Sequence, residues 1–260
     1  QYNISPETLI GRPFKDKDIS VDKLLKNEVK SDILDGIKKQ DVTLTPNGAL
    51  FRKDKKGFLP ELMQIIYDDR VKYKRLMLEA KQEYENTKDP KLKKDISRYD
   101  NIQMAKKISL NSAYGAIGNN WFRYYNLLVA EAITTSGQLS IRWIERSING
   151  YLNKTLGTDG LDYVIASDTD SVYITFDRLI DKLPIQGENT GEVINFLDRL
   201  ARDKIEPFID QSYQELAEHI NAYEQKMFMK REVIADKGIW TAKKRYILNS
   251  WDVEGVRYKE

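Results

Sequence analysis

The chain has 260 residues, and 42 Lys and Arg against 40 Asp and Glu leave a formal charge of +2, which by itself indicates no polyanionic partner. It has no cysteine and one histidine, His219, so disulfide scaffolds, cysteine catalysis, thiolate zinc sites and multi-histidine metal centres are excluded. No run reaches the about 18 apolar residues of a membrane span and no signal peptide is visible, so we expect a soluble protein without a membrane partner that is not secreted.

The first 60 residues are rich in Pro and Gly, which indicates turns. Ser5 followed by Pro6 predicts a helix start, because serine caps helices well and proline suits the first helical position. The apolar segments 49–51 and 57–59 flank a polar stretch and predict a short β-hairpin.

Two long helices are predicted next, at about 60–86 and 91–117, because apolar residues recur near the helical period of 3.6 residues. The short polar turn between them contains Pro90 and predicts an antiparallel pair. A third helix, at 131–156, has a broad apolar face and is expected to pack on a sheet.

The remaining chain mixes strands with a further helical region. Residues rich in β propensity within 163–176 flank Asp168-Thr169-Asp170 and predict a hairpin with acids at its turn. Residues 191–223 have a helical pattern, and 226–233 and 239–253 have strand-like patterns. This order predicts an α+β fold, an antiparallel sheet backed by helices and interrupted by the helical pair.

Asp168 and Asp170 form the first candidate site. Acids at a strand junction are often simple turn formers. A tight hairpin would also hold both carboxylates on rigid backbone, and Mg²⁺ prefers a few carboxylate oxygens with water and phosphate completing its octahedron. A turn without further function and a Mg²⁺ platform are therefore both compatible with this segment.

Lys107, Asn111 and Tyr114 form the second candidate site. Their spacing places them, together with Gln103, along one face of the second long helix. Lysine suits phosphate, and the tyrosine ring offers a flat surface to a base or sugar. The alternative is a solvated helix face with Tyr114 in the core.

Arg70 and Lys74 lie four residues apart on the first long helix. They could belong to a solvated face, with ion pairs to Asp68 and Asp69. In an antiparallel helix pair this face can instead meet Lys107 and form a clamp of three cations for a triphosphate.

A basic stretch, Lys243, Lys244, Arg245 and Tyr246, follows Trp240. In a strand, Lys243 and Arg245 would face one way and Lys244 and Tyr246 the other. Basic residues with interleaved aromatics suit a nucleic-acid backbone. The alternative is a charged edge strand that resists aggregation.

Three of these segments resemble motifs of the family B DNA polymerases. The segment around Asp168-Thr169-Asp170-Ser171 resembles their third polymerase motif, and the segment from Lys107 through Asn111-Ser112 to Tyr114-Gly115 looks like their second. Residues 243–246 match their primer-template motif. Residues 1–8, 121–125 and 228–232 are similar to the replicative polymerases of T-even-type bacteriophages, so the resemblance covers nearly the whole chain in the right order.

This resemblance implies a DNA-directed DNA polymerase, a nucleotidyltransferase of phage DNA replication that uses two Mg²⁺ ions. It implies that residues 1–59 and 119–260 form the palm and 60–118 the fingers. By motif position, Asp170 is implied to bind both metals, Asp168 to be a supporting acid and Glu232 to be an acid near the metal site.

The resemblance also implies roles in binding the two substrates. The residues implied to hold the incoming dNTP are Arg70, Lys74 and Lys107, with Lys107 also assisting catalysis, and Asn111 and Tyr114 are implied to line the nascent base pair. The residues implied to hold primer-template DNA are Lys243, Lys244, Arg245 and Tyr246.

The family's first motif, which carries a further metal-binding Asp, is absent from this sequence, as are the exonuclease domain, the N-terminal domain and most of the thumb. We therefore expect a fragment, either truncated or one subunit of a split enzyme, that is inactive alone. We expect it to act with those domains and a sliding clamp in the cytoplasm of an infected bacterium. The alternative is a non-catalytic, DNA-binding accessory piece of a split polymerase.

Overall fold

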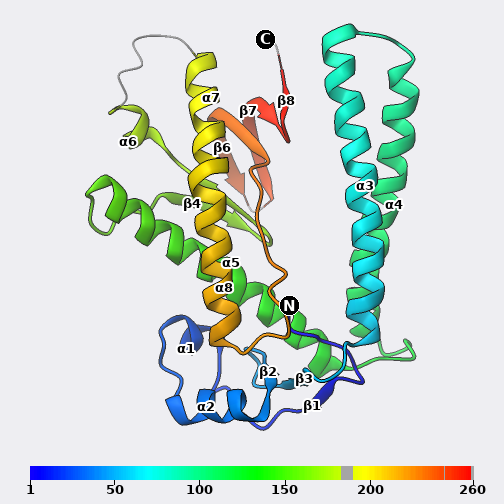
Figure 1. The fold of residues 1–260 in the computed structure, drawn as a ribbon, viewed down its shortest axis with the longest axis vertical. Helices are drawn as coiled ribbons and strands as arrows, with labels where there is room; N and C mark the ends of the chain where they lie inside the picture. Colours follow the sequence, from blue (N-terminus) through cyan, green and yellow to red (C-terminus); the bar gives the residue numbers. More distant parts are fainter. Residues whose placement is uncertain (183–189, 243, 259–260) are drawn as a thin grey trace. The chain divides into compact units, whose positions relative to one another are not determined.

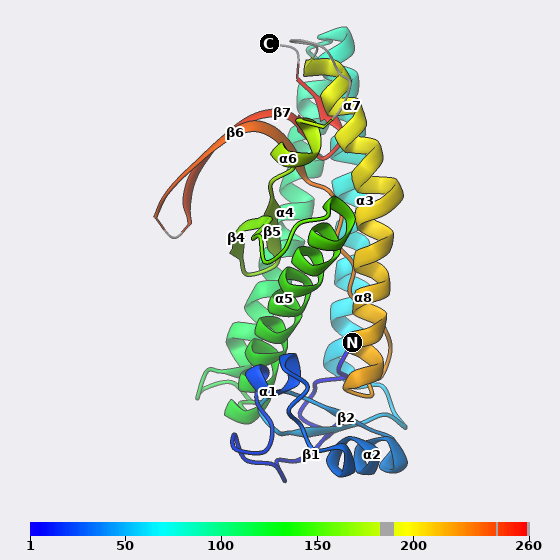
Figure 2. The same cartoon turned by 90° about the vertical axis from the view of Figure 1, so that its left-hand side faces the viewer.

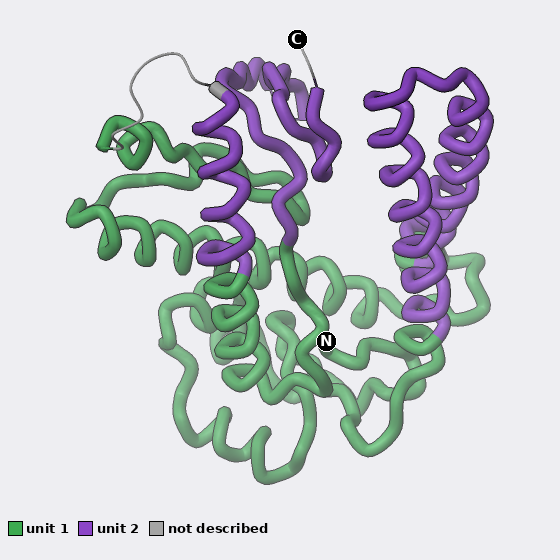
Figure 3. Tube along the Cα trace, turned by 45° about the horizontal axis from the view of Figure 1, so that its top comes forward, with its two compact units in different colours: residues 1–61, 114–184, 207–229 green, residues 62–113, 185–206, 230–260 purple. Residues whose placement is uncertain are grey.

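The computed structural model describes residues 1–182, 190–242 and 244–258 (Figure 1). The chain divides into two units, each assembled from segments far apart in the sequence (Figure 3). Unit 1 comprises residues 1–61, 114–184 and 207–229, and unit 2 comprises residues 62–113, 185–206 and 230–260. Both combine helices with small antiparallel sheets, so the α+β prediction is confirmed.

The N-terminal part of unit 1 is a three-stranded antiparallel sheet in the order β1 (Leu9–Gly11), β3 (Leu50–Arg52), β2 (Val42–Leu44). Two short helices, α1 (Val21–Leu25) and α2 (Ser31–Gln40), lie between β1 and β2 in the chain. Phe51 of the central strand is fully buried. It shares a core cluster with apolar residues from several elements, namely Ala49, Leu59, Ile117, Val129, Ala130 and Ala132.

Helix α5 (Leu127–Leu156) confirms the third predicted helix and begins four residues earlier. The side chain of Asn126 accepts the Val129 N–H at 3.1 Å and so caps its start. Gly157 ends the helix in the left-handed conformation with φ 67°, which glycine adopts without steric cost.

Helix α5 packs against a second helix, α8 (Glu206–His219), as well as against strands. The indole N–H of Trp143 donates to the Ser212 carbonyl at 3.0 Å, and Tyr151 stacks on Phe208 with ring centroids 4.3 Å apart. The sequence pattern predicted that α5 packs on a sheet. The structure shows α5 packed against strands β4 and β5 and also against helix α8. The broad apolar face of α5 is wide enough to contact both.

The predicted acidic hairpin is confirmed as β4 (Val164–Asp168) and β5 (Ser171–Ile174), followed by the short helix α6 (Asp177–Ile180). Asn149 of α5 anchors it, because its Oδ1 accepts the N–H groups of Tyr163 at 2.9 Å and Val164 at 3.0 Å. The hairpin therefore starts from a fixed point on the long helix of unit 1.

The two predicted long helices are confirmed as α3 (Phe58–Thr87) and α4 (Leu92–Ile117). They run side by side (Figures 1 and 2), and α3 enters unit 2 at Leu62 while α4 returns to unit 1 at Tyr114. Within unit 2 the Lys106–Asp69 ion pair, 2.5 Å long, and the Tyr73–Tyr99 contact join the two helices.

The remainder of unit 2 consists of α7 (Thr190–Leu200), a π-helical turn (Ala201–Ile205) and a three-stranded antiparallel sheet. The sheet follows the order β6 (Val233–Ala242), β7 (Arg245–Val253), β8 (Val256–Arg257). Figure 2 shows β6 and β7 as a long curved ribbon. No helix in the described ranges is long and apolar enough to cross a bilayer.

Two N-terminal predictions are wrong, and the side chain of Asn3 explains the second. Instead of opening a helix, residues 6–8 form a turn before β1, and the predicted hairpin at 49–59 is replaced by β3 and the start of α3. The Asn3 side chain donates to the carbonyls of Arg52 and Lys55 and accepts the Gly57 N–H at 2.8 Å. These bonds hold residues 52–57 as a loop.

The strand predicted at 226–233 is also wrong for most of its length, because β6 begins only at Val233. The Arg231 N–H donates to Glu206 at 3.0 Å and the Arg231 side chain binds Asp198 at 2.6 Å. These side-chain contacts take the place of strand pairing at this point of the chain.

Candidate functional site

The turn of the β4–β5 hairpin carries both predicted acids. Asp168 pairs with Ser171 across the hairpin, so Thr169 and Asp170 form a two-residue turn. The Asp170 N–H donates to the Asp168 carbonyl at 2.6 Å, and the Ser171 hydroxyl donates to the same oxygen at 3.2 Å. These hydrogen bonds fix the backbone of the turn, in which Thr169 separates the two acids.

Thr169 has φ 56°, in the left-handed region. A β-branched residue is rarely found there, because its Cβ substituents clash with the backbone. Its hydroxyl donates to Asp168 Oδ1 at 2.9 Å, which orients that carboxylate. Strained backbone of this kind clusters at functional sites. The left-handed Thr169 therefore favours the hypothesis of a Mg²⁺ platform over that of a turn without further function.

Asp170 is exposed, and its charge acts on the buried Tyr213 of unit 1. Burial raises the pKa of Tyr213, and the neighbouring Tyr2 and the negative charge of Asp170 raise it further. Burial also raises the pKa of Tyr2 to about 12, an effect that the Ser140 and Ser136 hydroxyls partly offset. Within residues 1–182, 190–242 and 244–258, the Asp170 carboxylate makes no hydrogen bond or ion pair, so it is available to a ligand.

The acids of this turn fit part of a divalent-metal site. Asp168 and Asp170 supply the oxygen donors that Mg²⁺ prefers, and this ion takes its other ligands from water and phosphate. No cluster of three or more His, Cys, Asp or Glu side chains suited to a metal occurs in the described part of the chain. The turn therefore fits a metal that is shared with a substrate, and a closed structural site does not fit.

The predicted cations lie on the part of the helical pair that belongs to unit 2. Lys74 forms an ion pair with Glu254, in the β7–β8 turn, instead of with the expected acids Asp68 and Asp69. Arg70 is half-buried, and its Nε has no hydrogen-bond partner among the described residues. Lys107 is exposed next to the Lys106–Asp69 ion pair.

The second candidate site was predicted along one face of α4. Some of its side chains are buried and others are exposed to solvent. Gln103 is buried and donates to Asp100 at 2.8 Å, whereas Lys107 and Asn111 are exposed. Tyr114 is 42% exposed, so it is not the core residue of the alternative reading. Lys107 and Asn111 in unit 2 and Tyr114 in unit 1 are therefore each accessible to a ligand.

The described residues of the basic stretch, Lys244 to Tyr246, lie around the tip of the β6–β7 ribbon. Lys244 lies in the turn with φ 62°, so it does not alternate with Arg245 in a strand as predicted, and Arg245 opens β7. Tyr246 pairs with Trp240 across the ribbon, with ring centroids 6.4 Å apart. Lys243 lies outside the described residues.

Two further features belong to the three-stranded sheet of unit 2. Trp240 folds over Gly238, where a Cβ atom would lie 2.6 Å from its ring, so only glycine fits beneath the tryptophan. Glu232 is exposed just before β6, and its carbonyl accepts the Glu254 N–H at 2.5 Å. Both features shape the surface of the same sheet in unit 2.

Sequence reasoning missed an aromatic surface in unit 1. Trp121 is 95% exposed, and Tyr124 and Tyr125 in the same loop are 41% and 40% exposed. Arg123 lies 5.7 Å from the ring of Tyr124. The density of aromatics around Arg123 in the sequence was the available signal, since clustered exposed rings are unusual in a loop.

The candidate residues are divided between the units. Asp168, Asp170 and Tyr114 belong to unit 1, and the other described candidates belong to unit 2. The structure describes the placement of each group within its own unit. The convergence of the acidic turn with the three cations on one triphosphate stays a prediction.

Comparison with known proteins gives the family. The sequence model of DNA polymerase family B matches residues 1–195. The chain is 36% identical to a DNA-directed DNA polymerase of Escherichia phage RB69 and 33% identical to one of Enterobacteria phage T4, over 100% of this chain in each case. It is also 32% identical to the DNA polymerase delta catalytic subunit of Candida albicans over 59% of the chain.

These matches cover only part of each relative, namely 33% of the RB69 protein, 34% of the T4 protein and 14% of the Candida albicans subunit. The chain thus spans about a third of the length of its phage relatives. The family model nevertheless matches three quarters of this chain, from its first residue to α7. The chain belongs to DNA polymerase family B.

Proposed function

We propose that this chain supplies the palm and fingers of a template-directed DNA polymerase of phage replication, with residues 1–59 and 119–260 as palm and 60–118 as fingers. The observation that carries the proposal is the acidic turn of β4–β5. It combines a strained Thr169 with an Asp170 carboxylate that no described residue pairs with, in a chain of this family. A turn without function would need neither feature.

The proposed reaction joins a deoxynucleotide to a primer. The primer 3′-hydroxyl attacks the α-phosphorus of the dNTP, and pyrophosphate leaves. Asp170 and Asp168, with Glu232 as an additional acid, would hold the two Mg²⁺ ions, which supply neutralisation of phosphate charge and acidification of the hydroxyl when bound.

The cations and the aromatic groups orient the substrates in this proposal. Lys107, Arg70 and Lys74 hold the triphosphate, and the Nε of Arg70, unpartnered among the described residues, supports an anion as its missing acceptor. Holding the reactants in position in this way removes much of the entropic barrier. Asn111 and Tyr114 lie beyond Lys107 on the same helix and line the nascent base pair.

The DNA contacts are proposed at two surfaces. Lys243, Lys244, Arg245 and Tyr246 bind the primer-template backbone. The exposed Trp121 with Tyr124 and Tyr125 offers rings on which template bases stack, an interaction worth about 1–3 kcal/mol per base. The remaining polymerase domains and a sliding clamp, in the cytoplasm of an infected bacterium, complete the proposed assembly.

The test is primer extension by a chimera in which this chain replaces the matching third of the RB69 polymerase. We expect extension that depends on Mg²⁺. Asp170→Asn should lower its rate by at least roughly a thousandfold, because a metal-ligating charge is lost, while duplex binding is retained. Lys107→Ala should mainly lower kcat/KM for the dNTP.

Asp159→Asn is the matched control, because Asp159 is also exposed in unit 1 but lies in the loop after α5. Its extension rate should equal that of the unchanged chimera. The proposal fails if the folded chimera binds primer-template without extending it, which would favour a DNA-binding accessory module. It also fails if Asp170→Asn extends at the normal rate.

A further inference from the structure

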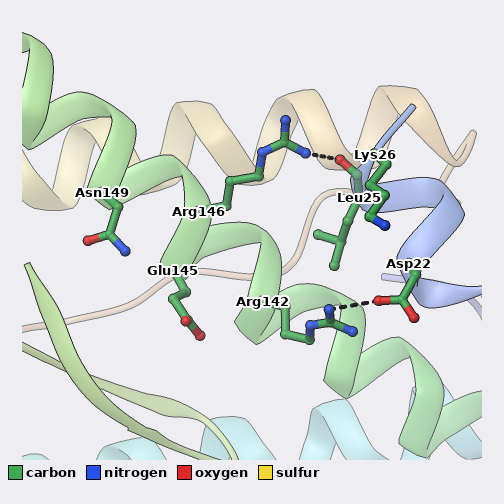
Figure 4. Close-up of a pocket in the computed structure, with 7 residues that line it drawn as sticks. All are labelled: Asp22, Leu25, Lys26, Arg142, Glu145, Arg146 and Asn149. Atoms are coloured by element: carbon green, nitrogen blue, oxygen red, sulfur yellow. Dashed lines mark hydrogen bonds and ion pairs between the residues drawn. The ribbon is translucent and has the colours of Figure 1, made fainter. Parts of the chain in front are cut away.

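A cavity of about 490 Å³ in unit 1 lies between α1 and α5 (Figure 4). Its wall carries three cations, Arg142 and Arg146 of α5 and Lys26 directly after α1. The two arginines are four residues apart and so share one face of the helix. The described residues that line this cavity include none of the proposed polymerase residues, so it needs an explanation of its own.

The two guanidinium groups are held in place by contacts that use few of their donors. Arg142 Nη2 binds Asp22 Oδ1 at 2.7 Å, and Arg146 Nη1 donates to the Leu25 carbonyl near the end of α1. Figure 4 shows both contacts at the side of the cavity nearest α1. A guanidinium has five N–H donors, so most of them stay open to a ligand.

Two carboxylates also line the cavity, so its formal charge is three cations against Asp22 and Glu145, a net +1. Asp22 is exposed and its pair with Arg142 is solvated, which makes this a weak contact that a stronger anion can displace. Asn149 is not a free donor, because its amide already binds Asp162, Tyr163 and Val164.

We propose that this cavity binds a phosphate group, carried either by a free phosphate compound or by the backbone of DNA. Pre-oriented arginine forks match phosphate oxygens in a bidentate manner, and little side-chain entropy remains to be lost on binding. The volume lies within the range of about 300–1,000 Å³ typical of small-ligand pockets. Arg142, Arg146 and Lys26 bind the phosphate, and Asp22 competes with it for Arg142.

The experiment is calorimetric titration of the 260-residue chain with inorganic phosphate and, separately, with a short single-stranded DNA. Arg142→Gln and Arg146→Gln should each weaken binding about tenfold, the effect of one lost charge-assisted hydrogen bond. Asp22→Asn should strengthen binding roughly threefold, since it removes the competing carboxylate. Lys154→Gln, an exposed cation on the same helix outside the cavity, is the control and should change nothing.

Each arm decides a different point. Arginine-dependent binding of phosphate alone assigns the cavity to a free phosphate compound, and arginine-dependent binding of the oligonucleotide assigns it to the DNA backbone. If neither probe shows arginine-dependent binding, the proposal is overturned. Equal weakening by Lys154→Gln and Arg142→Gln also overturns it, and so does weaker binding by Asp22→Asn, which stays informative even if an arginine variant does not fold.

Discussion

The Lys74 side chain, a candidate phosphate ligand, already forms an ion pair within the chain. Its ammonium group pairs with Glu254, and both side chains are mostly shielded, at 29% and 22% exposed. In the proposed polymerase this same lysine binds the triphosphate. In this proposal Glu254 competes with the triphosphate for the Lys74 ammonium group.

We predict that Glu254→Gln tightens Mg²⁺-dependent dNTP binding by the chain roughly threefold, the effect expected for removing one partly exposed ion pair. Fluorescence titration with a labelled dNTP measures this change. Glu79→Gln is the control, because Glu79 pairs with Arg75 at a more exposed place on the same helix. Unchanged or weaker binding in Glu254→Gln would show that Lys74 does not contact the triphosphate.

His219 is a second residue whose environment has a measurable consequence. Its Nε2 is buried and has no hydrogen-bond partner among the described residues, and its ring lies 5.9 Å from that of Trp143. Burial lowers the pKa of His219 below its usual 6.5, and the positive charge of Lys38 lowers it further. The folded chain therefore binds a proton at this imidazole less readily than the unfolded chain does.

The unfolded chain binds a proton at His219 at a higher pH than the folded chain does. The free energy of unfolding should therefore fall as the pH drops below about 6.5, by less than the limit of about 1.4 kcal/mol per pH unit because His219 is partly exposed. Urea unfolding of the wild type and His219→Gln at pH 7.5 and pH 5.5 measures this. A variant with the same pH dependence as the wild type would contradict it.

At the scale of elements, four buried or half-buried charges join the β6–β7–β8 sheet to α7 within unit 2. Asp252 is 1% exposed and binds both Arg231 and Arg257, the latter at 2.6 Å. Asp198 of α7 binds Arg231 at 2.6 Å and lies 3.8 Å from Arg257. The base of the ribbon that carries Lys244–Tyr246 is thereby fixed on a helix.

Arg231→Met should destabilise the chain by about 3 kcal/mol, because it leaves the buried Asp252 carboxylate with Arg257 as its only ion-pair partner among the described residues. Adding Asp252→Asn should recover part of the loss, since the uncompensated charge is then removed. Chemical denaturation measures both. The control is Arg75→Met, whose exposed ion pair on α3 should leave stability unchanged; equal losses in the two variants would refute a role for the cluster.

At the scale of the whole molecule, a net charge of +2 provides little general attraction for DNA. Any strong binding must therefore come from local concentration of charge, and the tip of the β6–β7 ribbon is the proposed place. Lys244 and Arg245 are both exposed there.

Removing both charges should make DNA binding less salt-dependent. The slope of log K against log salt for duplex DNA should fall in magnitude by about 0.9 for each phosphate that the protein no longer neutralises, so by about 1.8 in Lys244→Gln/Arg245→Gln. Fluorescence anisotropy at several salt concentrations measures the slope. Lys91→Gln, in the exposed turn between α3 and α4, should leave the slope unchanged, and an equal fall there would argue against binding at the ribbon tip.

Local patterns predicted the long elements of this chain well. Helices α3, α4 and α5 and the β4–β5 hairpin follow from apolar periodicity and β propensity spread over many residues, so no single interaction could override them. The short N-terminal elements were mispredicted, because the three hydrogen bonds of Asn3 decide the path of residues 52–57. Such long-range bonds leave no periodic trace in the sequence.

For the candidate site, the sequence by itself determined which residues are proposed to carry the chemistry, since the acidic turn and the basic stretch are contiguous and the cations recur at helical spacing. Only the tertiary structure decided how each is held: Thr169 in a left-handed turn, Lys74 paired with Glu254, Lys244 in a turn instead of a strand, and Arg142 with Arg146 beside a cavity. The reason is physical. Residue type and spacing are local properties, whereas burial, pairing and cavities arise between segments that meet only when the chain folds.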